Sequence, residues 1–292
     1  MQENPVTIDN LNSLASAGIS VHILRIDRVH PVVSGNKWFK LSPYLRQAWQ
    51  EGAHTIATFG GAYSNHIVAA AFAAREKGLQ SIGFIRGEAA GSQPTLEEAR
   101  SYGMQLRFVE RDRYRNKEAL VKQHTQPGWH WVPEGGYGLP GAEGAAAIVT
   151  SADTQPYSHI LCAVGTGTMM AGLVKAAKPD QTVIGIPVLK NPGAAQEMMG
   201  LLTAEERNKS FAVVPGYDFG GYAKHPPALL AFMREIWDRQ SLPTDIVYTS
   251  KMVFAAQDLV KKQYFPPGSR LLLIHSGGLQ GNRSLPPHSL PF

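Results

Sequence analysis

The segment SGNKWFKLSPYL, residues 34–45, places a lysine where a helix is expected to begin. Gly35 and Asn36 form a turn signal, and residues 38–49 have the pattern of a helix. Lys37 would therefore open that helix, where the positive end of the helix dipole disfavours a cation by about 0.3–1 kcal/mol. This position suits a lysine that works as a neutral, nucleophilic amine. A solvated surface lysine at a turn is the alternative reading.

The glycine loop GTGT, within AVGTGTMMAGL at residues 163–173, is a second candidate. It follows an apolar run and opens a helix, so its backbone N–H groups can converge on an anion. The loop comprises Gly165, Thr166, Gly167 and Thr168, and its threonines add hydroxyl donors. It is not a Walker A loop, because no Gly-Lys-Ser/Thr follows. It does not match the dinucleotide-binding fingerprint either, because a methionine stands at the position of the third glycine. A phosphate site and simple helix packing both remain open.

The composition is that of a folded globular protein, large enough for two lobes or one large domain. The chain has 292 residues, of which 43% are hydrophobic and 17% charged. No signal peptide or membrane-length apolar stretch is visible, so we expect a cytoplasmic protein without a membrane partner. The net charge of +5 comes from dispersed basic residues, which argues against nucleic acid as a partner. The single cysteine, Cys162, excludes an internal disulfide, and no metal site is expected.

Short apolar runs alternate with amphipathic ones, which is the rhythm of β-α-β units. The alternation runs through GAHTIATFG, NHIVAAAFAAREKGL, QSIGFIRG, PTLEEARSYG, MQLRFVE, RNKEALVKQH, HILCAVG, MMAGLVKAA and QTVIGIPVL. It predicts an α/β fold with parallel-rich twisted sheets and helices on both faces. Ligands in such sheets bind beyond the carboxyl ends of the strands. The turn FGGAYSNHIV at residues 59–68 and the GTGT loop therefore become the expected binding turns.

One ligand would use both the lysine and the glycine loop. Pyridoxal 5′-phosphate needs an amine for its aldehyde and an anion cradle for its phosphate. A nicotinamide-dependent Rossmann oxidoreductase would instead give Lys37 no role and require a ribose-binding acid after the loop. The stretch KPDQTVIGIPVLK has Asp180 before its strand and no acid at the end, which argues against that class. A non-catalytic carrier of the same cofactor would share the lysine and the loop but lack turnover.

SGNKWFKL resembles the GGNK-x-RKL segment of the fold type II pyridoxal phosphate enzymes in the 1-aminocyclopropane-1-carboxylate (ACC) deaminase and D-cysteine desulfhydrase family. In that family the lysine of GNK carries the cofactor, and Lys37 matches it. Further resemblances follow in family order: YSNH to the QSNQ or QSNH turn, GTGTMMAGL to the phosphate loop, DIVYTSK to DPVY-x-GK, and IHSGG to H-x-GG. The departures, at Trp38, Phe39, Ile246 and Ser250, leave the cofactor site intact but bear on substrate identity.

The resemblance implies a two-lobed fold of the tryptophan synthase β type, with the cofactor in the cleft between the lobes. The large lobe would comprise residues 1–42 and 146–292, and the small α/β lobe residues 43–145. The family also suggests a homodimer.

Individual roles follow from the same resemblance. Asn65 would bind the ring hydroxyl of the cofactor, and the turn of Ser64, Asn65 and His66 would face the substrate carboxylate, although helix capping and a packed histidine also explain these residues. Tyr222 and Tyr248 match tyrosines that flank the substrate. They could stack on the pyridine ring or exchange protons, but a phenol needs a lowered pKa to act as a base.

Thr249 and Ser276 set the expected branch of the family, because the deaminase branch carries glutamate and leucine at these positions. A carboxylate keeps the ring nitrogen protonated, whereas a hydroxyl leaves the ring less electron-withdrawing. The weaker ring still suffices for β-elimination of a good leaving group. The sequence therefore predicts a lyase acting on a small amino acid, most similar to D-cysteine desulfhydrase, with pyruvate, sulfide and ammonia as products. ACC deaminase, which gives 2-oxobutanoate and ammonia, is the alternative.

Overall fold

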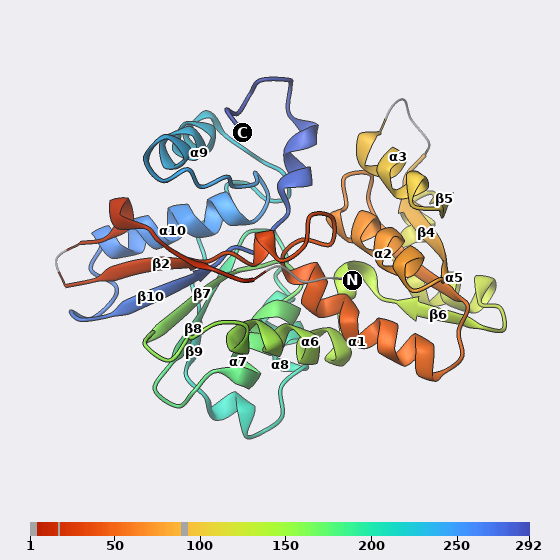
Figure 1. Ribbon diagram of the computed structural model, residues 1–292, viewed down its shortest axis with the longest axis horizontal. Helices are drawn as coiled ribbons and strands as arrows, with labels where there is room; N and C mark the ends of the chain where they lie inside the picture. The colour runs from red at the N-terminus through yellow and green to blue at the C-terminus, as the bar shows by residue number, and fades with distance from the viewer. Residues whose placement is uncertain (1–4, 17, 89–92) are drawn as a thin grey trace.

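The computed structural model describes residues 5–16, 18–88 and 93–292. Within these residues the strands form two sheets, with helices packed on both faces of each (Figure 1). One sheet has six strands in the order β1-β2-β10-β7-β8-β9, and the other has four in the order β5-β4-β3-β6. The α/β fold predicted from the alternating pattern is confirmed. None of the described helices is long and apolar enough to cross a membrane.

The six-stranded sheet combines strands from both ends of the chain. Its members are β1 (Ile8–Asn10), β2 (Ser20–Leu24), β7 (His159–Val164), β8 (Thr182–Pro187), β9 (Phe211–Val213) and β10 (Arg270–Ile274). β1 pairs antiparallel with β2, and the other neighbours in this sheet pair in parallel. Because β10 lies between β2 and β7, the carboxyl ends of these three strands meet at one edge. The segments that follow them are thereby brought together.

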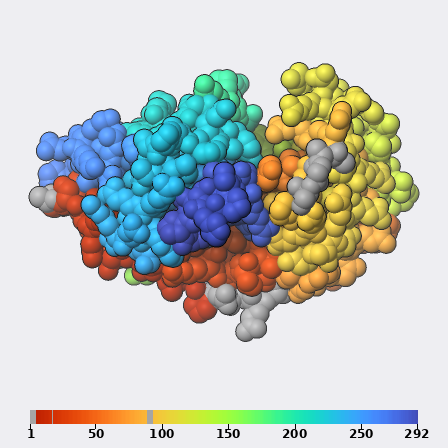
Figure 2. Space-filling view, turned by 90° about the horizontal axis from the view of Figure 1, so that it is seen from above, coloured from red at the N-terminus to blue at the C-terminus, as the bar shows by residue number. Residues whose placement is uncertain are grey.

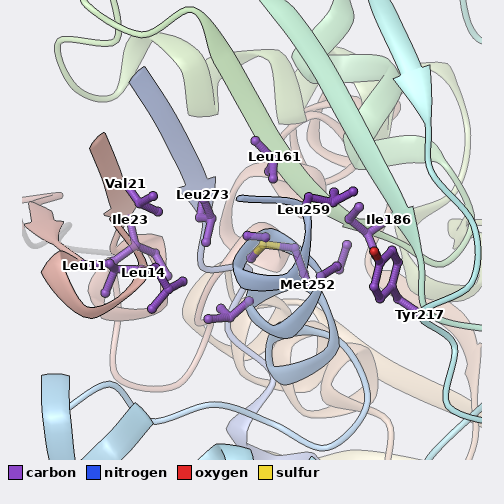
Figure 3. Packing of buried hydrophobic residues seen from close by; sticks show 14 of the residues in the cluster. Leu11, Leu14, Val21, Ile23, Leu161, Ile186, Tyr217, Met252, Leu259 and Leu273 are labelled. Carbon is purple, nitrogen blue, oxygen red and sulfur yellow. The ribbon is translucent and has the colours of Figure 1, made fainter. Parts of the chain in front are cut away.

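Helices cover both faces of this sheet. α9 (Pro227–Gln240) and α10 (Thr249–Lys261) pack on one face, and α6 (Leu139–Thr150), α7 (Thr168–Ala176) and α8 (Ala194–Met199) on the other. Figure 3 shows Met252 and Leu259 of α10 packed near Val21, Leu161 and Leu273 of the strands. Burial of this apolar layer fixes α10 against the sheet, at about 25 cal/mol for each Å² of apolar surface removed from water.

The four-stranded sheet contains β3 (Thr55–Gly60), β4 (Gln80–Arg86), β5 (Met104–Val109) and β6 (Trp129–Val132), all paired in parallel. One face carries α1 (Asn36–Gln50), α2 (Asn65–Glu76) and α3 (Pro94–Ser101), and the other α4 (Arg111–Arg115) and α5 (Lys117–His124). Every residue of β3 is buried. A strand covered on both faces reads as a continuous apolar run, which is why its sequence does not alternate.

The expected lobe boundaries, after residues 42 and 145, fall inside α1 and α6. These helices pack closely: a Cβ on Gly144 of α6 would lie 2.2 Å from the carbonyl oxygen of Phe39 in α1. The carbonyl of Phe39 would normally accept a helical hydrogen bond from the N–H of residue 43. Residue 43 is proline, which has no N–H, so this hydrogen bond is missing. All strands of the four-stranded sheet lie within 43–145, and those of the six-stranded sheet lie outside it. The two-lobe division stays a proposal, with α1 and α6 joining the two sheets.

The C-terminal segment also connects the two halves. The 3-10 helix η5 (Leu279–Ser284) lies against α3, where Arg283 and Glu98 form an ion pair. Figure 2 shows this dark-blue segment between the lighter blue C-terminal half and the yellow residues near position 100. The chain that follows β10 therefore runs from one sheet to the helices of the other.

Candidate active site

A cleft opens where β2, β7 and β10 end. It brings together many of the residues predicted from the sequence: Lys37, Asn65, Gly165, Thr166, Gly167, Tyr248 and Ser276 all line it. The other predicted residues, Ser64, His66, Thr168, Tyr222 and Thr249, lie outside its lining. The lysine, the glycine loop and the segment after β10 come from distant parts of the chain, so the sheet order is what assembles this site.

The Gly35–Asn36 turn fixes the start of α1 against the segment after β10. Gly35 has a φ of 63°, and a Cβ there would lie 2.0 Å from the carbonyl oxygen of Ser276. Only glycine fits such a close approach and such a backbone angle. The N–H of Asn36 donates to the same carbonyl at 3.1 Å. Lys37, the second residue of α1, is thereby placed in the cleft.

The amine of Lys37 loses its proton more easily than that of an ordinary lysine. Its Nζ donates to Oδ1 of Asn36 at 2.8 Å. Burial lowers the pKa of Lys37 to about 8, while the nearby carboxylate of Asp245 acts in the opposite direction. At pH 7 roughly one amine in ten is then neutral. Burial causes this shift, whereas the sequence prediction of a neutral amine rests on the helix dipole.

Lys40, one turn further along α1, is a second buried lysine in the cleft. Burial lowers the pKa of Lys40 well below its usual range, and the charge of Lys37 lowers it further. Among the described residues no carboxylate forms an ion pair with Lys40. Sequence reasoning assigned Lys40 no role, and its spacing of three residues from Lys37 was the available signal. A bound anion would stabilise its charged form.

The glycine loop joins β7 to α7, and its conformation needs its glycines. Gly167 has a φ of 75°, and a Cβ there would come within 2.6 Å of α8. A Cβ on Gly165 would lie 3.3 Å from the ring of Tyr248 across the cleft. The hydroxyls of Thr166 and Thr168 are hydrogen-bonded at 3.0 Å. Because the first amides of a helix have no partners within it, this loop can hold an anion.

The turn after β3 places an unsatisfied amide in the cleft. Ser64 is the N-cap residue of α2 but makes no side-chain capping bond, and Asn65 is the first helical residue. The Oδ1 atom of Asn65 is buried and has no hydrogen-bond partner among the described residues. Leaving such an atom unpaired costs about 1–3 kcal/mol. An unpaired buried amide in a cleft is therefore suited to a ligand.

His66 is packed behind the cleft lining. The hydroxyl of Thr58 donates to the carbonyl of Val132 at 2.7 Å, so it accepts from Nε2 of His66 at 2.8 Å. Nδ1 is then the unprotonated nitrogen, and it is buried without a described partner. Burial lowers the pKa of His66 well below its usual range, and Lys37 and Lys40 lower it further, so the imidazole is neutral. This geometry agrees with the packed histidine, and a role toward the substrate stays a prediction.

Thr249 is engaged by a carboxylate that sequence reasoning missed. The N–H of Asp245 donates to Oγ1 of Thr249 at 2.8 Å, and that hydroxyl donates to Oδ1 of Asp245 at 2.7 Å. The same carboxylate accepts the N–H groups of Val247, Tyr248 and Thr249, so it caps the start of α10. Burial raises the pKa of Asp245, and these hydrogen bonds oppose the rise. An acid just before a helix start was the signal that could have identified it.

The two predicted tyrosines differ in exposure but both keep their protons. Tyr248, the N-cap residue of α10, lines the cleft, whereas Tyr222 is 50% exposed. Burial raises the pKa of Tyr248, and the nearby Tyr222 and Asp245 raise it further. Burial also raises the pKa of Tyr222. At neutral pH these phenols can donate hydrogen bonds or protons, but they are not suited to act as bases.

Cys162 lies in β7, fully buried, and burial raises the pKa of its thiol to about 12. A thiol with this pKa is not a nucleophile at neutral pH. Within the described part of the chain, no three His, Cys, Asp or Glu residues are grouped so that they could hold a metal ion.

Comparison with known proteins identifies similar chains over nearly the whole length. The family described as "Pyridoxal-phosphate dependent enzyme" matches residues 8–277. A "Putative 1-aminocyclopropane-1-carboxylate deaminase" of Pyrococcus horikoshii is 29% identical over 287 residues, which cover 90% of this chain and 86% of that one. A "D-cysteine desulfhydrase" of Yersinia pestis is 24% identical over 302 residues, covering 94% and 92%.

A plant protein carries both names. The "Bifunctional D-cysteine desulfhydrase/1-aminocyclopropane-1-carboxylate deaminase, mitochondrial" of Arabidopsis thaliana is 26% identical over 311 residues, which cover 95% of this chain and 76% of that protein. Among solved structures, an ACC deaminase homologue matches with a TM-score of 0.81 and 26% identity, over 96% of this chain and 91% of the other. The fold is thus shared with this solved structure, and the sequence similarity extends over nearly the whole chain.

Proposed function

Since the chain belongs to the family of pyridoxal-phosphate dependent enzymes, we propose that it is a lyase that eliminates the thiol of D-cysteine. Hydrolysis of the remaining product by one water molecule then gives pyruvate and ammonia beside the released sulfide. The alternative within the same site is ACC deamination to 2-oxobutanoate and ammonia. Relatives that carry one or both of these names support a small amino acid as the substrate. The observation that carries the proposal is the buried amine of Lys37, with a pKa of about 8, in a cleft with an anion-binding loop.

The cleft residues fit this cofactor. Lys37 would be the amine that holds it, and Asn65, with its unpaired amide oxygen, would bind the ring hydroxyl. The loop of Gly165 to Thr168 would hold the phosphate together with the amine of Lys40, whose charged form a bound anion stabilises. When bound, the cofactor supplies an aldehyde for amines and a ring that withdraws electrons from the α-carbon of the substrate.

The chain itself supplies proton transfer and substrate orientation. The neutral form of Lys37 takes the α-proton on its Nζ, which its lowered pKa permits near neutral pH. The start of α2, with Ser64 as its N-cap residue, would bind the substrate carboxylate through helix N–H groups. A thiol with a pKa of about 8.5 leaves as a thiolate without help from a strong acid. The protonated phenols of Tyr222 and Tyr248 are then needed only as hydrogen-bond donors.

The choice of D-cysteine over ACC rests more on Ser276 than on Thr249. Ser276 lines the cleft, at the position where the deaminase branch is expected to carry leucine. Thr249 does not line the cleft, and its hydroxyl both donates to and accepts from Asp245. A polar group at Ser276 suits a polar substituent on the substrate better than a cyclopropane ring.

The test is a product assay with the unmodified protein. Sulfide and pyruvate released from D-cysteine, and 2-oxobutanoate released from ACC, are measured under one set of conditions, with Lys37→Ala as the inactive control. We expect sulfide and pyruvate in equal amounts and a higher kcat/KM for D-cysteine than for ACC. Efficient ACC turnover without sulfide would replace the main proposal by the alternative.

By family resemblance we also propose a cytoplasmic homodimer. Light scattering should then give twice the 31.8 kDa mass of one chain. A mass equal to that of one chain would contradict it.

A further inference from the structure

Tyr222 lies in a loop, residues 218–223, whose backbone is held in an unfavourable conformation. Phe219 has a φ of 52° and Ala223 a φ of 53°, and the two glycines between them have φ values of 96° and 113°. Left-handed backbone is unfavourable for a residue that carries a Cβ. The loop therefore needs support from outside itself to keep this shape.

The support comes from Lys251, whose side chain is fully buried in the first turn of α10. Its Nζ donates to the carbonyls of Asp218 at 2.8 Å, Gly221 at 2.7 Å and Val188 at 3.1 Å. An ammonium has three protons to donate, so these three bonds satisfy it completely. Two of the carbonyls belong to the loop, and the third follows β8 directly. Hydrogen bonds from a charged donor are stronger than those from a neutral donor.

The loop is held separately at its beginning and near its end. Before the loop, the hydroxyl of Tyr217 donates to Asp258 at 2.7 Å, and Figure 3 shows Tyr217 beside α10. At the residue just before Tyr222, the carbonyl accepts from Lys251. Tyr248 precedes Lys251 by one helical turn as the N-cap residue of α10. One lysine side chain thus joins the loop that carries Tyr222 to the helix start that carries Tyr248.

We infer that Lys251 is a positioning residue for Tyr222: it holds residues 218–223 so that the phenol stands close to Tyr248 at the edge of the cleft. The two phenols are near enough for Tyr222 to contribute to the raised pKa of Tyr248. The inference rests on the proposed function, in which Tyr222 contacts the substrate. Lys251 itself does not line the cleft.

A double-mutant cycle tests this inference through activity. In the holoenzyme, Lys251→Met should lower kcat/KM for D-cysteine about tenfold, mainly by raising KM, because the phenol is no longer in place. In a Tyr222→Phe background the same substitution should cost less than about twofold, because the phenol is already absent. Lys261→Met, at the exposed end of the same helix, serves as the control and should leave kcat/KM unchanged. An equal loss in both backgrounds would show a general structural role and overturn the inference.

A second readout does not depend on turnover. Trypsin can cut after Lys224, an exposed residue that follows the loop. Cleavage there should be about tenfold faster in Lys251→Met than in the unmodified protein or in Lys261→Met, because the loop opens more often. An unchanged cleavage rate would overturn the inference. If no substrate is turned over, the proposed function fails, but the cleavage rates still test the role of Lys251. Should Lys251→Met not fold, Lys251→Gln keeps two N–H donors and is compared in the same way.

Discussion

The hydroxyl of Thr249 donates a hydrogen bond to the buried carboxylate of Asp245, and the two oxygens are 2.7 Å apart. The same carboxylate caps the start of α10, where Tyr248 enters the cleft, and its charge favours the ammonium of Lys37. The buried carboxylate of Asp245 therefore stabilises the start of α10 and partly offsets the lowering of the pKa of Lys37 by burial. It also engages the hydroxyl proton of Thr249, a residue that does not line the cleft.

Asp245→Asn should lower the pKa of Lys37 below its present value of about 8. The carboxylate stabilises the protonated amine, so its removal favours the neutral form, and burial then acts without opposition. An amine-reactive reagent is added to the cofactor-free protein at a series of pH values. The rate at which it modifies Lys37 is measured by mass spectrometry. The midpoint should move to lower pH in Asp245→Asn and stay in Asp238→Asn, where the acid is exposed. An unchanged or higher midpoint in Asp245→Asn would refute this electrostatic account.

Lys40→Met should weaken binding of the phosphorylated cofactor selectively. If the ammonium pairs with the phosphate, affinity for pyridoxal phosphate should fall at least about tenfold, while affinity for pyridoxal, which has no phosphate, should change by less than about twofold. Equilibrium titration of both ligands gives the two affinities, with the exposed Lys77→Met as the matched control. Equal losses for the two ligands would place Lys40 away from the phosphate.

Thr166→Val provides the corresponding test of the glycine loop. Thr166 is only partly buried, so the fold should tolerate the change while the loop loses one hydroxyl donor. A bulky residue at Gly167 is less informative, because a Cβ there would come within 2.6 Å of α8 and disturb packing as well. We expect the same selective loss of pyridoxal phosphate over pyridoxal, with Thr150→Val on α6 as control. Unchanged affinity would mean that the loop only packs the helix on the sheet.

Local sequence signals predicted the elements and several cleft residues because each is a short-range feature. Adjacent residues alone predict three of these features: the Gly35–Asn36 turn, the start of α1 and the GTGT loop. Their assembly followed from the parallel strands, whose carboxyl ends share one edge. The support of the tyrosine loop was not predictable, because the partners of Lys251 are backbone carbonyls, and any residue type provides those.

The burial of ionisable side chains is the second feature that the sequence could not predict. Lys37 and Lys40 are three residues apart, and the sequence could not show that both line one cleft or that Lys40 is buried. The engagement of Thr249 by Asp245 depends on where α10 begins, which local propensity predicts only to within a few residues. The exposure of Tyr222 depends on a loop of positive φ angles, a conformation that its Phe-Gly-Gly-Tyr-Ala sequence only partly signals.

Ser276→Leu should shift substrate preference toward ACC. The substitution replaces the cleft hydroxyl by leucine, the residue that the family resemblance implies for the deaminase branch. It removes a polar partner and adds an apolar surface for the ring. The ratio of kcat/KM for D-cysteine to kcat/KM for ACC should fall by about tenfold. Adding Thr249→Glu is a weaker test, because a second carboxylate beside Asp245 would destabilise the start of α10. A ratio that stays constant in Ser276→Leu would remove Ser276 as the residue that selects the branch.

The most direct measurement identifies which of the three buried lysines carries the cofactor. Lys37, Lys40 and Lys251 all have pKa values lowered by burial, so a lowered pKa alone does not distinguish them. Their surroundings distinguish them. Lys251 donates hydrogen bonds to three carbonyls, whereas Lys37 lies in the cleft at the start of α1. Borohydride reduction of the holoenzyme followed by peptide mapping should place the pyridoxyl group on Lys37. A pyridoxyl group on Lys40 or Lys251 would contradict the site described here.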